Sequence, residues 1–321
     1  MTTLSTSAAQ APIAPAPVLE SSVRKTKIVC TAGPACHTHE QLREIIRAGA
    51  NVVRLNFSHG DHDWHRATLA NVRAVAAELG RPVAVMQDLC GPKIRISRLR
   101  AEGLTVQPGM RLTITTDAFL DDAAAHATTE YDLASTYAGL LDDVQVGNTI
   151  LLDDGRIELV VESKVRGRLV AQVLRGGKVL PRNGMNLPGV DLSTSAVTPK
   201  DMEDLAWAIE NDVDLVALSF VRCADDLLPV LERIADAGSP IRVIAKIERP
   251  EAVADIDAIL RAADGLMVAR GDLGVETGLV RVPLMQKSLI DQCRRSGKPV
   301  ITATQVLESM VHDSTPIRAE V

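Results

Sequence analysis

A lysine and two carboxylates stand where short apolar runs of this sequence end. Lys246 and Glu248 are two residues apart, and in a strand this spacing puts both side chains on one face. Asp272 follows the next apolar run, in a turn flanked by glycines. Two carboxylates with water suit a hard divalent cation such as Mg²⁺, and a nearby ammonium can stabilise charge on a transferring phosphoryl group. A plain salt bridge between Lys246 and Glu248 is the alternative.

Two more segments have both charged and neutral polar side chains near the end of an apolar run. In Val53–Gly60 (VRLNFSHG), Arg54, Asn56 and Ser58 alternate, so one face offers a guanidinium for phosphate and neutral oxygens for a cation. Asp88–Arg95 (DLCGPKIR) adds a carboxylate and two bases. This mixed polarity is hard to explain as packing, and it predicts a binding site.

Backbone amides and one hydroxyl group are further candidates for this predicted binding site. The amides around Gly271 can point at an anion, as they do in a nest or at a helix start. Thr304 follows the last apolar run and faces the same predicted rim, although helix capping is the alternative role for this side chain.

Seven short apolar runs, β-branched or aliphatic, predict strands that are buried on both faces of a parallel sheet. They are Thr26–Thr31, Val52–Phe57, Val83–Gln87, Asp214–Phe220, Ile241–Ile247, Gly265–Ala269 and Pro299–Ala303. Helical patterns lie between most of them: Glu40–Ala48 before Gly49, Trp64–Leu79 before Gly80, and a helix from Pro199 to about Asn211 behind the capping box of Thr198 and Asp201. Pro250 and Pro283 also suit helix starts.

The polar residues named above fall at or just past the carboxyl ends of these runs. In a (β/α)8 barrel this rim is where catalytic residues gather. A Rossmann sheet is the competing fold, but no GxGxxG follows the first strand. We therefore expect an α/β fold of the TIM-barrel type.

A long interval separates the third predicted strand from the fourth. Within it, alternating strands and turns, including the turn Asp153–Gly155, predict an all-β domain inserted after strand three. We expect residues 97–188 to form this lid, residues 24–96 and 189–321 to form the barrel, and residues 1–23, rich in Ala, Pro, Ser and Thr, to be a disordered tail.

Only seven barrel strands can be identified. After Thr304, the sequence predicts a helix over Gln305–Val311 and the start of another at Thr315-Pro316, and no eighth strand appears before Val321. We expect a barrel that is incomplete because the chain is truncated.

Composition excludes several classes of protein. The 321 residues are 46% apolar and 24% charged, with a net charge of −6, which argues against a general nucleic-acid binder. No apolar run is long enough to predict a membrane span, and residues 1–22 lack the features of a secretory or transit signal. Five scattered cysteines are typical of reduced thiols, so we expect a cytoplasmic protein.

Six motifs, in this order, resemble the pyruvate kinase family. They are Arg54–Gly60 (RLNFSHG), Asp88–Arg95 (DLCGPKIR), Asn186–Gly189 (NLPG), Lys246–Glu248 (KIE), Ala269–Gly274 (ARGDLG) and Thr302–Met310 (TATQVLESM). The resemblance implies a barrel interrupted by a mobile β-domain, and transfer of a phosphoryl group from phosphoenolpyruvate to ADP, giving pyruvate and ATP. It also implies a C-terminal domain, absent from this sequence, and a homotetramer for the full-length protein.

The resemblance also implies roles for individual residues. Lys246 would stabilise the phosphoryl group and Arg54 would grip the phosphate, while Glu248 and Asp272 would hold Mg²⁺ or Mn²⁺. Thr304 and the segment Ala269, Arg270, Gly271 and Asp272 would bind the substrate. His59 and Arg95 would meet the nucleotide, and Asn56, Ser58, Asp88, Leu89 and Lys93 would occupy the monovalent-cation site.

Two departures from the family pattern modify these expectations. Where the family often has Glu, this chain has Lys93, with Leu89 nearby, and such members tend not to need K⁺; a tethered ammonium can replace the ion. A basic residue that reaches ATP phosphate in the family is replaced by Asn183, with Arg182 one place earlier.

The alternative functions are a non-catalytic fragment that binds only metal and phosphoenolpyruvate, and another phosphoenolpyruvate-using barrel such as a carbon–carbon lyase. The predicted inserted domain, Arg95 and the NLPG motif disfavour the lyase.

Overall fold

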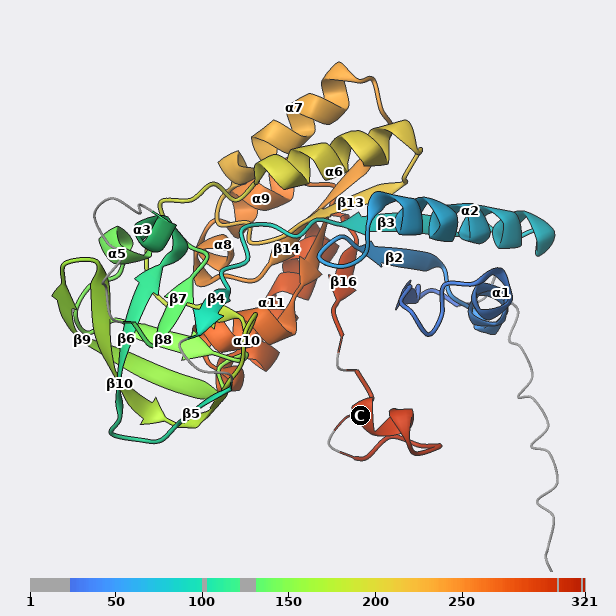
Figure 1. Cartoon of the computed structure of the whole chain (residues 1–321). Helices are drawn as coiled ribbons and strands as arrows, with labels where there is room; N and C mark the ends of the chain where they lie inside the picture. The colour runs from blue at the N-terminus through green and yellow to red at the C-terminus, as the bar shows by residue number, and fades with distance from the viewer. Residues whose placement is uncertain (1–23, 100–102, 122–130, 305, 319, 321) are drawn as a thin grey trace, which may run out of the picture.

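A parallel sheet of seven strands forms the centre of the structure (Figure 1). The computed structural model describes residues 24–99, 103–121, 131–304, 306–318 and 320, so the predicted tail, residues 1–23, lies outside the described residues. The strands are β1 (Val29–Thr31), β2 (Val52–Asn56), β3 (Ala84–Asp88), β13 (Leu215–Leu218), β14 (Arg242–Ile247), β15 (Gly265–Val268) and β16 (Val300–Thr302), and they pair in this order. All seven predicted strands are confirmed within a few residues of their predicted ends.

The sheet curls into a nearly closed barrel. Met86, Ala217, Ile244 and Met267 form one buried cluster, and Val29 of β1 and Ile301 of β16 pack against it. These residues come from strands across the whole sheet, including its two edges, so one face of the sheet is wrapped around a common interior.

Helices cover the outer face of this sheet. They are α1 (His39–Ala48), α2 (His62–Glu78), α6 (Pro199–Glu210), α7 (Leu228–Asp236), α8 (Pro250–Ala254), α9 (Ile256–Ala262), α10 (Arg270–Thr277) and α11 (Val282–Arg295). Their apolar faces share one buried cluster with outward-facing strand residues such as Val53 and Leu55. Among the helices that the structure describes, none combines the length and apolar character needed to cross a bilayer.

A second, mostly antiparallel sheet is formed by the chain between β3 and β13 (Figure 1). Its strands, in spatial order, are β12 (Met185–Asn186), β8 (Thr149–Leu152), β9 (Ile157–Val165), β10 (Arg168–Arg175), β6 (Arg111–Thr116), β7 (Leu133–Ser135) and β4 (Ile96–Leu99). The two-stranded pair β5 (Leu104–Val106) and β11 (Gly177–Val179) and the short helices α3 (Asp117–Asp121) and α5 (Leu140–Asp143) accompany it. This unit has a separate apolar core.

The end of the chain differs from the prediction. Only a short 3₁₀ turn forms, at Glu308–Val311, and residues 315–318 are not helical; Gln305 lies outside the described residues. The apolar side chains Val306 and Val311 are exposed. Because an isolated short helix is marginal without an apolar face to pack, the predicted pattern does not produce one here.

The start of α6 is tied to the segment that leaves β3. The predicted capping box is confirmed: Asp201 accepts hydrogen bonds from the Thr198 amide at 2.8 Å and the Thr198 hydroxyl at 2.6 Å. The other oxygen of Asp201 accepts from the Gly91 amide at 3.0 Å. Gly91 has φ +65°, and a Cβ there would lie 2.9 Å from the ring of Phe220, so both conformation and space favour glycine. Asp201 thus joins the exit from the barrel to the return helix.

Replacing this buried carboxylate tests that connection. We expect Asp201→Ala to lower the free energy of unfolding by about 2 kcal/mol, because it removes the side-chain half of the capping box that accepts from Thr198 and leaves the buried Gly91 amide unpaired. Asp257→Ala, at an exposed first-turn position of α9, is the matched control and should change it by less than about 0.5 kcal/mol. Urea unfolding followed by tryptophan fluorescence measures both, and equal effects would contradict the proposed connection.

Candidate active site

Four charged side chains meet at the carboxyl ends of three barrel strands. Arg54 lies in β2, Asp88 ends β3, Lys246 lies in β14 and Glu248 follows β14. Parallel strands end at the same edge, so residues far apart in the sequence are brought together there. Arg54, Asp88, Lys246 and Glu248 are called the charge cluster below.

Short contacts connect the members of the charge cluster. Lys246 Nζ lies 3.1 Å from Asp88 Oδ1 and 3.0 Å from Glu248 Oε1. Arg54 Nη2 lies 2.6 Å from Asp88 Oδ2. Both carboxylates have only 1% of their side-chain surface exposed, and Lys246 has 12%. The cluster is therefore a nearly desolvated arrangement of two cations and two anions.

Burial and charge oppose each other within this cluster. Burial lowers the pKa of Lys246, but attraction to Glu248 and Asp88 outweighs it, so the pKa of this ammonium is raised above its ordinary value. Burial raises the pKa of the Glu248 carboxyl; attraction to Lys246 opposes this rise, and repulsion from Asp272 adds to it. Lys246 therefore stays a cation at neutral pH and is unsuited to act as a base.

Ser219 and Phe220 complete the cluster, although the sequence analysis did not single them out. Ser219 Oγ accepts a hydrogen bond from Lys246 Nζ at 2.7 Å and donates to the Leu89 carbonyl at 2.7 Å. The Phe220 amide donates to Glu248 Oε2 at 2.6 Å, from a residue with φ +56°. A left-handed phenylalanine is uncommon, and here it directs an amide at a buried carboxylate. The polar position directly after β13 was the available signal for Ser219.

The charge cluster borders a cavity of about 420 Å³ at this rim. Every residue predicted for substrate and divalent-metal binding lines it: Arg54, Lys246, Glu248, Ala269, Arg270, Gly271, Asp272 and Thr304. Arg270 Nη2 donates to the carbonyls of Ala303, at 2.9 Å, and Thr304, at 2.5 Å, which joins the ends of β15 and β16. The sequence prediction that these segments meet at one place is confirmed.

The first turn of α10 borders the same cavity. Gly271 and Asp272 lie in this turn, and the residue before the helix, Ala269, makes no side-chain cap. The amides of a first helical turn have no partner inside the helix and carry a partial positive charge. With Lys246 and Arg54 nearby, this wall of the cavity favours an anion.

Glu248 and Asp272 are the residues of this cavity that could bind a metal cation. Both line the cavity, and repulsion from Asp272 contributes to the raised pKa of Glu248. Within the described residues, no group of three or more His, Cys, Asp or Glu side chains is arranged to hold a metal. Two carboxylates fit Mg²⁺, which keeps several waters or substrate oxygens as ligands, better than a metal that needs a full protein cage.

The segment that follows β2 is held in place by contacts from α2. Asn56 Oδ1 accepts from the Ser58 amide at 3.1 Å, and the His59 side chain is exposed. Phe57 stacks on His65 of α2 with ring centroids 3.9 Å apart, and a nitrogen of His65 lies 2.9 Å from the His59 carbonyl. The His65 contacts fix the backbone that carries Asn56, Ser58 and His59.

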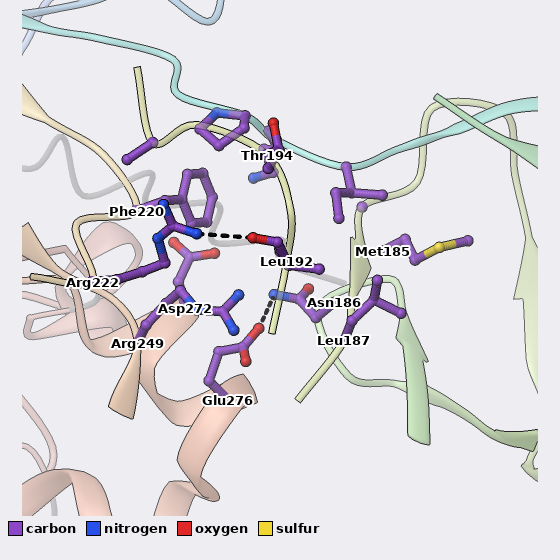
Figure 2. A pocket seen from close by; sticks show the side chains of 15 residues that line it. Met185, Asn186, Leu187, Leu192, Thr194, Phe220, Arg222, Arg249, Asp272 and Glu276 are labelled. Atoms are coloured by element: carbon purple, nitrogen blue, oxygen red, sulfur yellow. Dashed lines mark hydrogen bonds between the residues drawn. The ribbon is translucent and has the colours of Figure 1, made fainter. Parts of the chain in front are cut away.

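A second, narrower cavity of about 30 Å³ lies between the two sheets (Figure 2). Lys93 lines it together with Asn186 of the second sheet and Asp272, which borders both cavities. Leu89 is buried at 1% exposure, and its carbonyl accepts from Ser219, so its apolar side chain supplies packing. Of the residues predicted for a monovalent-cation site, Asp88 belongs to the charge cluster and Lys93 lines the second cavity.

Arg95, Arg182 and Asn183, three of the residues considered for nucleotide binding, lie in segments that flank strands of the second sheet. Arg95 Nη1 donates to the Arg182 carbonyl at 3.1 Å. Asn183 donates to Asp153 Oδ1 at 2.9 Å and accepts from the Leu180 amide at 2.6 Å, so its side chain supports a turn. Arg182 has φ +67°.

Removing the central cation tests how the cluster is stabilised. We expect Lys246→Met to lower the free energy of unfolding by about 3 kcal/mol at pH 8, because two carboxylates would stay buried without their ammonium. The loss should be smaller at pH 5, because attraction to Lys246 opposes the raised pKa of Glu248. Without the ammonium this pKa rises further, the folded state binds more protons, and acid favours folding more than it does in the wild type. Urea unfolding at both pH values measures this, with exposed Lys287→Met as the control. An equal loss at both pH values would contradict the account.

The amino-acid sequence of this chain is similar to that of known proteins. Residues 23–321 match the family model described as "Pyruvate kinase, barrel domain". Pyruvate kinase of Geobacillus stearothermophilus is 47% identical over 300 residues, covering 92% of this chain and 50% of that protein. Pyruvate kinase 2 of Synechocystis sp. is 47% identical over 302 residues, covering 93% and 50%. The chain spans about half the length of the curated relatives it matches. From the match to the barrel-domain model and these identities, the chain belongs to the pyruvate kinase family.

Proposed function

We propose that this chain carries the site for transfer of a phosphoryl group from phosphoenolpyruvate to ADP, giving pyruvate and ATP. The observation that carries the proposal is the charge cluster, a buried ammonium between two carboxylates, whose members Arg54, Lys246 and Glu248 line the 420 Å³ cavity. Phosphoryl transfer needs positioning and neutralisation of charge more than covalent chemistry from the protein. The fixed ammonium of Lys246 would neutralise charge, and the first turn of α10 beside it would position the anion.

Lys246 and Arg54 would act on the phosphoryl group. The raised pKa keeps Lys246 an ammonium, so its role is to stabilise negative charge that develops during transfer. Arg54 uses Nε and Nη2 on Asp88 and Nη1 on Thr31. A guanidinium has five N–H donors, so this geometry leaves donors for a phosphate while Asp88 and Thr31 fix their direction.

Glu248 and Asp272 would hold Mg²⁺ or Mn²⁺ next to the phosphate. When bound, such an ion neutralises phosphate charge and orients the phosphate oxygens. Thr304 and the first-turn amides at Gly271 and Asp272 would bind the carboxylate and the enolate oxygen of the substrate, because they line the anion-binding wall of the cavity.

The second sheet would act as the lid of this site. We propose residues 97–188 as the inserted domain of an incomplete (β/α)8 barrel formed by residues 24–96 and 189–321. Arg95, at the entrance to this sheet, and His59, exposed on the barrel rim, would contact the nucleotide.

Turnover and binding assays test the function together. With phosphoenolpyruvate, ADP and Mg²⁺, the chain should form pyruvate, detected by coupling to lactate dehydrogenase, and Lys246→Met should reduce the rate at least about 100-fold. Exposed Lys287→Met should leave the rate unchanged. Calorimetric binding of phosphoenolpyruvate with Mn²⁺ but no turnover would favour the non-catalytic binding fragment and overturn the proposed reaction for this chain.

We also propose that this activity does not need K⁺. Lys93 stands at the position where the pyruvate kinase family often has glutamate. It lies half-buried at the cavity that it shares with Asp272, where a single tethered positive charge would replace the ion. Wild-type activity should be the same in K⁺ and in tetramethylammonium, whereas Lys93→Glu should need K⁺ and lose at least about tenfold without it. Exposed Lys287→Glu is the control for the charge change. Strong activation of the wild type by K⁺ would refute the proposal.

A further inference from the structure

Helix α10 has functional side chains at both of its ends. Asp272 lies in its first turn, and Glu276 lies one turn later, at a spacing that puts both side chains on one face. Figure 2 shows Asp272 and Glu276 along the same cavity, with Asn186 opposite Glu276. Both residues belong to one two-turn helix, so a segment that contacts Glu276 is thereby placed relative to Asp272.

The second half of α10 contacts the second sheet directly. Asn186 Nδ2 donates a hydrogen bond to Glu276 Oε1 at 3.0 Å (Figure 2). Asn186 is part of β12, which pairs with β8 within that sheet. The neighbouring residue, Val275, lies 3.6 Å from the place where a Cβ on Gly155 would be, in the turn between β8 and β9. The sheet therefore contacts α10 through this hydrogen bond, and Val275 lies close to the turn between β8 and β9.

Other barrel side chains contact the segment that connects β12 to α6 rather than a strand of the second sheet. Arg249 donates to the Val190 carbonyl at 3.2 Å, and Arg222 donates to the Leu192 carbonyl at 3.0 Å. Each of these arginines also pairs with an acid close to it in sequence, Arg249 with Glu251 and Arg222 with Asp226. The bond from Asn186 to Glu276, in contrast, reaches a strand of the second sheet.

Packing alone does not explain a carboxylate at this position. Glu276 is half-buried, and its second oxygen, Oε2, is buried with no hydrogen-bond partner among the residues that the structure describes. An unpaired buried carboxylate oxygen is costly. Its side chain is nevertheless held in the cavity by the hydrogen bond to Asn186.

We propose that Glu276 is a positioning residue that fixes the second sheet against the helix carrying the metal carboxylate Asp272. The contact would keep Arg95, proposed to meet the nucleotide at the entrance to the second sheet, in register with the phosphate side of the site on the barrel. This inference rests on the proposed function for its effect on catalysis, but the contact itself does not depend on turnover.

Hydrogen–deuterium exchange of the ligand-free chain tests the contact. Glu276→Ala should speed exchange of the amides in residues 186–193 about fivefold, because the sheet loses its bond to α10. Glu276→Gln keeps an acceptor oxygen for Asn186 and should retain wild-type protection. Asn186→Asp should match or exceed the effect of Glu276→Ala, because two carboxylates would then face each other. Glu203→Ala, exposed on α6, should have no effect.

The kinetic constants test the positioning role. Glu276→Ala should raise KM for ADP about fivefold and leave KM for phosphoenolpyruvate within about twofold, because the proposed phosphoenolpyruvate ligands all lie on barrel elements. Glu276→Gln should restore KM for ADP. Unchanged exchange in Glu276→Ala and Asn186→Asp, or equal increases in both KM values, would overturn the proposal. A chain without turnover but with the predicted exchange pattern would contradict the proposed function and leave the contact supported.

Discussion

Burial of Asp88 and Glu248 on either side of one ammonium is the constraint on which this structure depends. Removing two carboxylates from water is costly, and the arrangement is stable only while Lys246 lies about 3 Å from both of them. That geometry requires β3 and β14 to end at the same level, although about 150 residues separate them in the sequence. The charge pairing at the rim therefore depends on the relative positions of the barrel strands.

Several local features follow from this constraint. The left-handed backbone of Phe220 brings an amide to Glu248, and Ser219 ties the ammonium of Lys246 to the Leu89 carbonyl. Asp201 then links the segment that leaves β3 to α6, through the Gly91 amide. Each of these contacts pairs a buried polar group, and together they join the end of β3 to β13, β14 and the return helix.

The sequence was sufficient to predict the seven barrel strands and the meeting of their polar ends, because short aliphatic runs and the residues after them carry that pattern. It did not reveal Ser219, Phe220 or Glu276, whose roles depend on backbone direction and on contacts between segments far apart in the chain. The helix expected from Thr315 is wrong for a similar reason: its local pattern is helical, but residues 315–318 have no helical structure and Val311 before them is exposed.

Anomalous X-ray diffraction from crystals soaked with Mn²⁺ and phosphoenolpyruvate is the most direct test of the central claim. The account predicts one manganese peak bound by the carboxylates of Glu248 and Asp272, with the substrate phosphate in contact with the Lys246 ammonium and the Arg54 guanidinium. A manganese peak away from these two carboxylates, or a phosphate bound outside the cavity that Lys246 and Arg54 line, would contradict it.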